Sequence, residues 1–205
     1  MPYVEIAAKP LPEKIYNTEA NGISRRTHDE HYKLYQGYVN KTNEIRKALA
    51  ALAEEDFAAG NQVYSKIRSL KTDLTFALGG VYNHEVYFDI LGGSGGTPTG
   101  RVAELIQRDF GSYENWARDL KATGMSARGW AWTAVNHATG ELFNYLGDAQ
   151  NTFPVWGATP ILALDTYEHA YYLDFAVARA GYIDAFLKSI DWDAVNARLA
   201  AAPGQ

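Results

Sequence analysis

Residues 164–172 read LDTYEHAYY and stand at the end of a short apolar run. The run from Ile161 to Leu164 predicts a buried strand that ends at Asp165. Asp165 and His169 are four residues apart, so their side chains can point to one side of a helical turn. An Asp-x-x-x-His spacing also occurs often by chance. The stretch therefore predicts a strand-to-helix junction that could offer two metal ligands.

The sequence before this junction contains two more predicted strands and two predicted helices. Residues 130–135 and 142–145 read as strands that flank a turn at Ala138-Thr139-Gly140. Helices are expected near 99–109 and 112–125, and a helical pattern returns from about 168 to 200. The second half is therefore predicted to be α+β, with a small three-stranded antiparallel sheet and helices.

The first half is predicted to be a long antiparallel helical hairpin. Pro10 and Pro12 favour an extended arm over residues 1–22. Ser24 is a plausible N-cap for a helix over 24–58, and a break at 58–61 precedes a second helix over 62–91. Two long helices joined by a short turn form an antiparallel pair.

The boundary between the two halves is predicted at a glycine-rich segment. Residues 92–100 read GGSGGTPTG, which is the composition of a linker. The expected organisation is an arm and helical hairpin over 1–91, the linker, and a C-terminal α/β domain over 101–205.

The composition excludes several classes of function. The 205 residues carry 19 Lys and Arg against 24 Asp and Glu, a net charge of −5 without a basic block, so nucleic acid is not expected as a partner. The absence of cysteine excludes disulfides and thiolate metal sites. The N-terminus shows no secretory signal, and no apolar stretch is long enough to span a membrane. A soluble cytoplasmic protein without a membrane partner is expected.

Five histidines are the other candidate metal ligands: His28, His31, His84, His137 and His169. Three imidazoles and one carboxylate form a ligand set that suits iron, manganese or zinc better than calcium or magnesium. His137 lies beside the predicted hairpin turn and is interpreted as a solvated surface residue. A histidine on a packed helix is more often a core residue than a ligand, so spacing alone leaves the metal site open.

Several segments, in order, resemble motifs of the iron/manganese superoxide dismutase family. LDTYEHAYY resembles the signature Asp-x-Trp-Glu-His-Ala-Tyr-Tyr, which holds the family's third and fourth ligands. Asn83-His84 within GGVYNHEVYF resembles the motif with the second ligand. The other matching segments are Pro10-Leu11-Pro12, Tyr38-Val39-Asn40, Gly129-Trp130-Ala131-Trp132, 182–186 and 190–192. Motifs in the correct order along nearly the whole chain are more specific than any one of them.

The resemblance implies His31, His84, Asp165 and His169 as ligands of one iron or manganese ion per chain. The assignment of His31 depends on how this segment is aligned with the family's motif. Counting forward from Thr27 gives His31, whereas the family's spacing back from Tyr38 gives Glu30, so the chain is one residue shorter here. His31 is chosen because it still shares a helical face with Tyr38. His28 is the second choice, ahead of Glu30.

The resemblance also assigns residues around the metal. It implies Tyr38 at the substrate entrance, Trp130, Trp132 and Tyr167 as aromatic walls, and Gln150 as the group that bonds the metal's solvent, with Asn151 as the alternative. Tyr167 replaces the signature tryptophan, and the histidine expected four residues after the first ligand is missing. Gly80 stands where iron-type members carry the glutamine, and Gln150 precedes a Pro, here Pro154. This arrangement leans towards manganese.

The activity implied is conversion of superoxide to dioxygen and hydrogen peroxide by a redox-cycling metal. Because superoxide is an anion and the chain is acidic, Lys33 and Arg179 are candidates for local positive charge at the entrance. The resemblance implies a homodimer, which can pair into a tetramer, with Glu168 and Tyr171 at the interface. The alternatives are a non-catalytic protein on the same scaffold and, less favoured, a helical-hairpin interaction module.

Overall fold

The computed structural model describes residues 3–152 and 155–204. Pro154, which the sequence comparison places after Gln150, lies outside the described residues. Within them, no helix combines the length and the apolarity that crossing a membrane requires.

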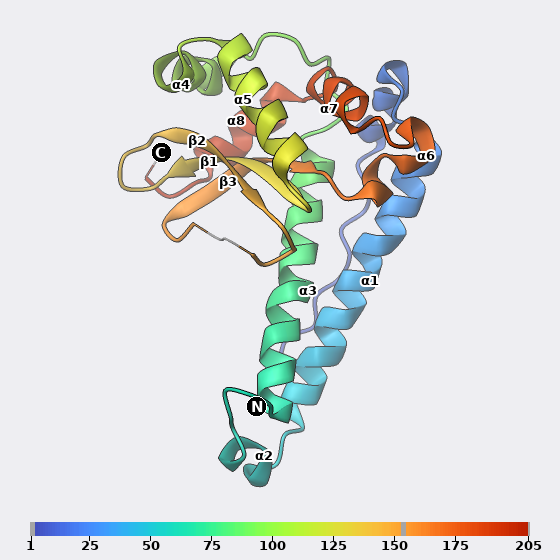
Figure 1. Cartoon of the computed structure of the whole chain (residues 1–205), viewed down its shortest axis with the longest axis vertical. Coiled ribbons are helices and arrows are strands. Elements are labelled where there is room, and N and C mark those ends of the chain that lie inside the picture. The colour runs from blue at the N-terminus through green and yellow to red at the C-terminus, as the bar shows by residue number, and fades with distance from the viewer. Residues whose placement is uncertain (1–2, 153–154, 205) are drawn as a thin grey trace.

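Two long antiparallel helices form a stalk that extends from the rest of the molecule (Figure 1). They are α1 (Arg25–Ala50) and α3 (Lys66–Asp89), and the short helix α2 (Glu54–Ala58) lies at the tip between them. Ser24 and Ser65 cap α1 and α3 by accepting from the backbone N–H groups of Thr27 and Arg68. The hairpin is confirmed, but the first helix stops earlier than predicted, and its connection to the second holds a helix of its own.

The N-terminal arm contains a helix that the sequence did not predict. Residues 3–12 are irregular, as expected, but Glu13–Asn21 form the 3-10 helix η1. The prediction of an extended arm over residues 1–22 is therefore wrong in its second part. The arm is fixed to α1, because Ile6 exchanges two backbone hydrogen bonds with the Asn43 side chain. The Lys9 amide also donates to the Tyr35 hydroxyl at 2.9 Å.

The C-terminal half holds a three-stranded antiparallel sheet of order β2-β1-β3. Its strands are β1 (Trp130–Asn136), β2 (Leu142–Gly147) and β3 (Ala158–Asp165). Helices α4 (Gly100–Phe110) and α5 (Tyr113–Ser126) precede the sheet close to their predicted bounds. The α+β fold class is confirmed.

The segment after the sheet is less regular than predicted. The expected helical stretch over 168–200 consists of η2 (Glu168–Ala170), α6 (Tyr172–Phe175), α7 (Arg179–Leu187) and α8 (Trp192–Ala200). Ala176, between α6 and α7, has φ of 46°, a left-handed conformation that an α-helix cannot continue through.

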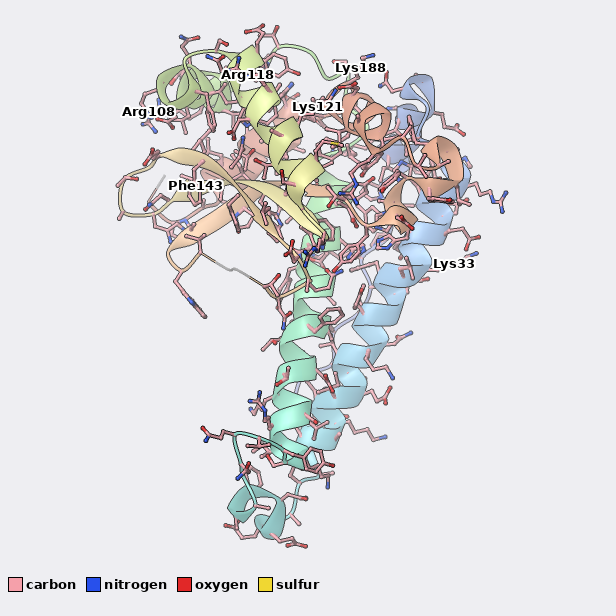
Figure 2. The ribbon with its side chains drawn as sticks, in the orientation of Figure 1. Lys33, Arg108, Arg118, Lys121, Phe143 and Lys188 are labelled. Carbon is pink, nitrogen blue, oxygen red and sulfur yellow. The ribbon has the colours of Figure 1, made fainter. Side chains whose placement is uncertain are left out.

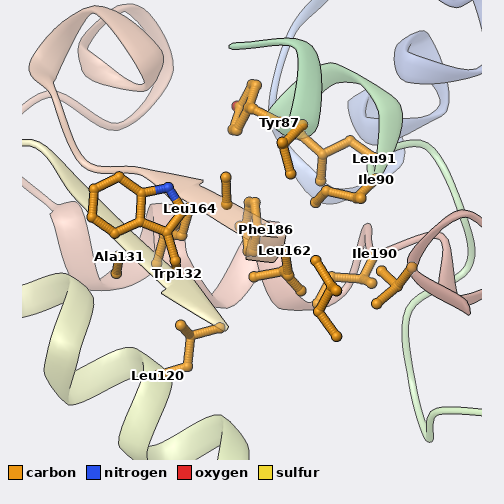
Figure 3. Packing of buried hydrophobic residues seen from close by; sticks show 14 of the residues in the cluster. Tyr87, Ile90, Leu91, Leu120, Ala131, Trp132, Leu162, Leu164, Phe186 and Ile190 are labelled. Carbon is orange, nitrogen blue, oxygen red and sulfur yellow. The ribbon is translucent and has the colours of Figure 1, made fainter. Parts of the chain in front are cut away.

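One buried apolar cluster joins the two halves (Figure 3). It includes Tyr87 from α3, Leu120 from α5, Leu162 and Leu164 from β3, and Phe186 from α7. Helix α3 packs against β3 and against α1. The C-terminal part of α3 is thereby held against the end of β3, where Asp165 lies.

The glycine-rich segment between the halves is bound to the end of α7 and the start of α8. The amides of Gly92 and Gly93 donate to the Ser189 carbonyl at 2.9 and 3.1 Å. Gly92 has φ of 91°, and a Cβ there would lie 2.1 Å from the Lys14 carbonyl oxygen. Gly96 also has positive φ, at 73°, but a Cβ there would contact nothing within 4 Å. The division of the chain at residues 92–100 stays a prediction.

We expect Gly92→Ala to destabilise the protein much more than Gly96→Ala. Positive φ alone costs an L-residue about 1 to 2 kcal/mol, and the overlap with Lys14 adds about 1 to 3 kcal/mol at Gly92 only. Urea unfolding of both variants at equal metal content measures the difference. Equal losses of unfolding free energy would show that the close approach of the segment to the arm is not needed.

Candidate metal centre

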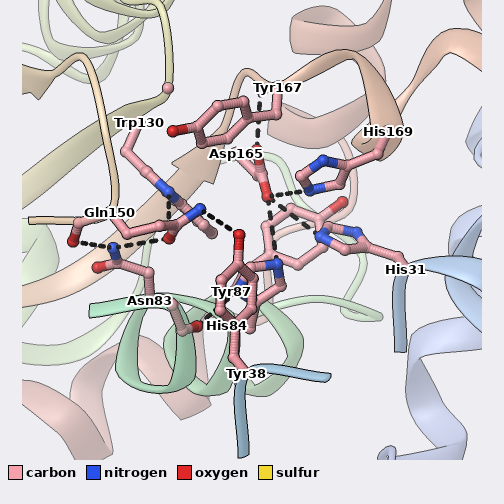
Figure 4. A network of polar contacts seen from close by, with 12 residues as sticks. His31, Tyr38, Asn83, His84, Tyr87, Trp130, Gln150, Asp165, Tyr167 and His169 are labelled. Carbon is pink, nitrogen blue, oxygen red and sulfur yellow. Dashed lines mark hydrogen bonds and ion pairs between the residues drawn. The ribbon is translucent and has the colours of Figure 1, made fainter. Parts of the chain in front are cut away.

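Four side chains from four elements meet between the hairpin and the sheet (Figure 4). His31 comes from α1, His84 from α3, Asp165 from the last position of β3 and His169 from η2. One ligand atom of each lies within 4.8 Å of the others, in the only such group among the residues described. The structure therefore brings together the four residues that the sequence comparison selected.

Asp165 is the centre of the group. Its Oδ2 atom lies 3.1 Å from His31 Nε2, 3.2 Å from His169 Nε2 and 3.8 Å from His84 Nε2. Its Oδ1 atom accepts a hydrogen bond from the Tyr167 amide at 2.9 Å. This bond holds the carboxylate so that one oxygen faces the three imidazoles.

His84 presents an unprotonated nitrogen to the centre. His84 Nδ1 lies 2.6 Å from the Gly80 carbonyl, which can only accept, so Nδ1 carries the proton and Nε2 is free. His84 Nε2 is buried and has no hydrogen-bond partner in the described part of the chain. A buried nitrogen lone pair without a partner is costly unless it binds a ligand. The donor set and this orphaned atom fit a divalent or trivalent iron or manganese ion.

The electrostatics favour the ligand form of His31, His84 and Asp165, whereas burial of His169 is outweighed by the charge and hydrogen bond of Asp165, which raise the pKa of His169. Burial lowers the pKa of His31 to about 4 and that of His84 to about 3, so both rings are neutral near pH 7. Burial alone would raise the pKa of Asp165, but the charge and hydrogen bond of His169, with help from His31, hold it well below its usual range. Asp165 therefore stays ionised and supplies the negative charge that a metal cation requires.

The alternative first ligands lie outside the group. His28 is buried, and its Nε2 atom bonds Thr18 Oγ1 at 2.7 Å. Since the Thr18 hydroxyl donates to the Ile23 carbonyl, His28 donates to Thr18 and serves the packing of η1 on α1. Glu30 is exposed and pairs with Lys33.

His137 differs from its prediction. It is half-buried, and its Nε2 atom bonds Thr159 Oγ1 at 2.7 Å across the sheet. The prediction of a solvated surface residue is therefore wrong, because the β1–β2 turn folds back against β3.

Gln150 lies against the centre and is held from three sides (Figure 4). Its side-chain oxygen accepts from Trp130 Nε1 at 3.0 Å, and its backbone carbonyl accepts from Asn83 Nδ2 at 3.2 Å. Its amide nitrogen is thereby turned to donate to the Tyr38 hydroxyl at 3.3 Å. Asn151, the alternative, is bonded to Thr75 at the surface.

Two glycines on α3 make room for this arrangement. A Cβ at Gly79 would lie 2.1 Å from the Gln150 carbonyl oxygen, and one at Gly80 would lie 2.5 Å from the Tyr38 ring. Any larger residue would displace the amide or the tyrosine. The sequence analysis gave Asn83 and Gly79 no role at the site, although both stand within five residues of His84.

Aromatic rings enclose the four ligands. Trp130 meets His84 edge-on at a centroid distance of 5.2 Å, and Tyr167 stacks on His169 at 5.4 Å. Trp132 lies one layer further out, stacked on Trp130 at 6.3 Å. Burial raises the pKa of Tyr167 to about 12, and burial together with the Asp165 charge raises the pKa of Tyr38. Both phenols are therefore protonated at neutral pH.

The two candidate cations, Lys33 and Arg179, differ in exposure and in hydrogen bonding. Arg179 is half-buried, donates to the Tyr171 hydroxyl and to the Ala127 carbonyl, and so is committed to packing. Lys33 is largely exposed on α1 and pairs with Glu30 (Figure 2). It lines a hollow of about 430 Å³ that opens beside His31 and His169.

The two candidate interface residues also differ. Glu168 is exposed on the wall of the same hollow, and its carboxylate has no partner within the described ranges. Tyr171 is only 3% exposed and stacks on Tyr182 within the chain, so it presents no surface to a partner. The next residue, Tyr172, is 49% exposed.

A buried three-histidine, one-carboxylate group between a helical hairpin and a small sheet defines a mononuclear metalloprotein. Sequence comparison matches residues 10–92 to the alpha-hairpin domain and residues 98–198 to the C-terminal domain of iron/manganese superoxide dismutases. The chain belongs to this family, which confirms the resemblance drawn from its motifs.

Relatives of both metal types match over most of their length. A protein named superoxide dismutase (Fe) from Aquifex pyrophilus is 41% identical over 88% of this chain and 86% of its own. Its counterpart from Aquifex aeolicus is 40% identical over the same shares. Superoxide dismutase (Mn) 1 of Halobacterium salinarum is 35% identical over 85% of this chain and 84% of its own.

We expect His84→Ala and His31→Ala to lose bound metal, while His28→Ala and His137→Ala retain it. The first two remove a nitrogen that faces the centre, whereas the other two bond threonines elsewhere. Elemental analysis after gel filtration in the presence of a mild chelator measures retention. Retention by His31→Ala with loss by His28→Ala would reverse the ligand assignment on α1.

Proposed function

We propose that this chain is a superoxide dismutase that binds one iron or manganese ion through His31, His84, Asp165 and His169. The observation that carries the proposal is the convergence of these four donors, with the His84 nitrogen buried and unpartnered, in a member of the family. No feature favours a non-catalytic protein on the same scaffold, because the donors, Tyr38 and Gln150 are all present around one centre.

An ion held by these four residues would supply the redox couple that conversion of superoxide requires. The chain's own groups do the rest. Superoxide is small and anionic, and reduction to hydrogen peroxide consumes two protons. A proton donor near the ion must therefore reload from solvent between turnovers.

Tyr38 and Gln150 are placed to hold and pass these protons. The half-buried Tyr38 hydroxyl accepts from the Gln150 amide, and its own proton stays available because its pKa is raised. Trp130 and Asn83 fix the amide in this orientation. Trp130 and Tyr167 exclude bulk water from the ligands, which strengthens electrostatic interactions there.

Lys33 supports the approach of the substrate. It lies on the wall of the hollow beside His31 and His169, and its charge offsets part of the repulsion from the net charge of −5. The pairing with exposed Glu30 weakens this effect, so Lys33 contributes to encounter more than to binding.

The choice between iron and manganese stays part of the proposal. The combination of Gly80 on α3 and Gln150 from the β2–β3 connection slightly favours manganese, as the sequence comparison predicts. Groups that bond a metal-bound solvent tune its protonation and the metal's potential. The cytoplasmic location also stays a prediction.

We expect protein loaded separately with iron and manganese to bind about one ion per chain, and at least one form to consume superoxide rapidly. Elemental analysis paired with a superoxide assay on each form provides the measurement. A metal-replete protein without activity in either form contradicts the proposal.

Gln150→Ala and Asn151→Ala provide a matched pair for this assay. Gln150→Ala removes the amide that faces Tyr38, and the rate per bound metal is expected to fall at least tenfold. Asn151→Ala removes a surface bond to Thr75 and is expected to leave the rate unchanged. Equal rates for both variants would exclude Gln150 from the reaction.

We also propose that two copies of the chain associate through the face around Glu168. Exposed Leu34, Tyr172 and Leu173, at 43%, 49% and 52% exposure, give this face an apolar surface, and the Glu168 carboxylate stands unpaired among them. His169 is partly exposed on the same side. At this face Tyr172, and not the buried Tyr171, is the tyrosine that we expect to contact the partner copy. Further pairing into tetramers stays a prediction.

We expect Glu168→Lys to raise the dimer dissociation constant at least tenfold, because it reverses a charge that would be enclosed at the interface. Glu141→Lys makes the same charge change on the exposed β1–β2 turn and is expected to have no effect. Sedimentation velocity over a range of protein concentrations compares the two. A wild-type chain that stays monomeric at all concentrations would exclude the interface.

A further inference from the structure

A column of three oxidisable rings leads from the metal centre to the far strand of the sheet. His84 meets Trp130 at a centroid distance of 5.2 Å, Trp130 stacks on Trp132 at 6.3 Å and 13°, and Trp132 stacks on Tyr145 at 4.9 Å and 29°. Aromatic rings at these separations are in contact. In the proposed conversion of superoxide, Trp130 is a wall of the site, Trp132 lies one layer behind it, and Tyr145 has no role.

The backbone is shaped to keep the column closed. Trp130 and Trp132 both point to the same face of β1, because alternate residues of a strand share a face. Tyr145 is the direct cross-strand partner of Trp132 on β2. A Cβ at Gly147 would lie 2.6 Å from Trp132 Cη2, so only glycine there leaves room for the indole.

Whether an oxidised ring of the column can lose a proton depends on the hydrogen-bond partners of its polar atom. Trp132 Nε1 is buried without a partner in the described residues, and Trp130 Nε1 donates only to an amide oxygen. Neither indole therefore has a base that could take its proton, and an oxidised indole here stays a reactive radical cation.

Tyr145 differs from the two indoles in this respect. It is half-buried on β2 beside Phe143, which lies at the outer part of the sheet (Figure 2). Tyr145 is only partly buried, whereas Trp130 and Trp132 are buried, so it is the ring of the column that lies nearest to solvent. Burial of the ring raises the pKa of Tyr145 to about 12, so the phenol carries a proton that it can release on oxidation.

We propose that Trp130, Trp132 and Tyr145 form a path that carries oxidising equivalents from the metal centre to the protein surface. The oxidant is hydrogen peroxide, the product of the proposed function, on which this inference rests. When peroxide meets the ferrous centre, reduction to two water molecules requires two electrons and two protons. An iron ion held in the ferrous state by His31, His84, Asp165 and His169 would supply one of these electrons.

The second electron comes from Trp130, is replaced from Trp132, and is replaced there from Tyr145. Tyr145 releases its phenolic proton with the electron and becomes a neutral radical, so one of the two protons comes from Tyr145 and the other from solvent. A small one-electron reductant of the ascorbate type returns a hydrogen atom to the half-buried phenol. His84 is thereby spared, because the vacancy leaves through Trp130, which it contacts.

The test treats iron-loaded, reduced protein with excess peroxide and a nitroso spin trap, and maps modified residues by peptide mass spectrometry. We expect a trapped adduct on Tyr145 in the wild-type protein. In Trp132→Phe this adduct falls at least fivefold, and oxidation of Trp130 rises at least twofold. Addition of ascorbate suppresses the adduct in the wild-type protein.

Three controls accompany the test. Tyr113→Phe removes another half-buried tyrosine, whose ring neighbours are Trp116 and Trp192 rather than the column, and leaves the Tyr145 adduct unchanged. Zinc-loaded protein, which has no redox couple, gives no adduct. Tyr145→Phe keeps superoxide consumption and gives no adduct at position 145, while oxidation of Trp132 increases.

Wild-type protein without a Tyr145 adduct overturns the proposal, as does an adduct that persists unchanged in Trp132→Phe. If Trp132→Phe does not fold, Tyr145→Phe decides alone, because unchanged oxidation at Trp130 and Trp132 would show that no vacancy reaches Tyr145. Superoxide consumption, measured on the same preparations before peroxide is added, separates failure of the path from failure of the proposed function.

Discussion

The carboxylate of Asp165 is fully buried, and a buried charge is costly unless neighbouring groups compensate it. The Tyr167 amide, His31 and His169 provide that compensation within the chain. It remains incomplete, because the His84 nitrogen that faces the same oxygen has no partner in the described residues. A cation at the centre would satisfy the carboxylate and this nitrogen together, so binding of metal and stability of the fold are coupled.

The architecture follows from the need to bring these groups to one point. Asp165 ends β3, and the packing of α3 on β3 and α1 places His84 and His31 on either side of it. The turn into η2 then returns His169 towards the carboxylate only four residues later. The common apolar cluster of hairpin and sheet fixes these elements together, which a metal site on rigid elements requires.

Local sequence predicted those features that local interactions determine. The Ser24 cap, the bounds of α4 and α5, and the Asp165–His169 pair depend on residues close in the chain. The 3-10 helix of the arm could not be inferred in this way, because it is fixed by distant contacts such as Thr18 with His28. Likewise, the reasons for Gly79 and Gly80 lie in Gln150 and Tyr38, and only the fold shows them. The count from Thr27 and the helical face shared with Tyr38 favoured His31 and left His28 as the second choice, and only the fold shows that His28 lies outside the group of ligands.

The glycine at position 80 and the glutamine at position 150 depend on each other. A side chain at position 80 would overlap the Tyr38 ring, so a glutamine on α3 could reach the centre only if Tyr38 moved away. With glycine there, the space is free for an amide that enters from the β2–β3 connection and is held by Trp130 and Asn83. Trp130 consequently serves two neighbours at once: its edge fixes Gln150 and its face contacts Trp132. The amide that we propose to take part in proton transfer and the rings that we propose to carry electrons are thus joined at Trp130, beside His84.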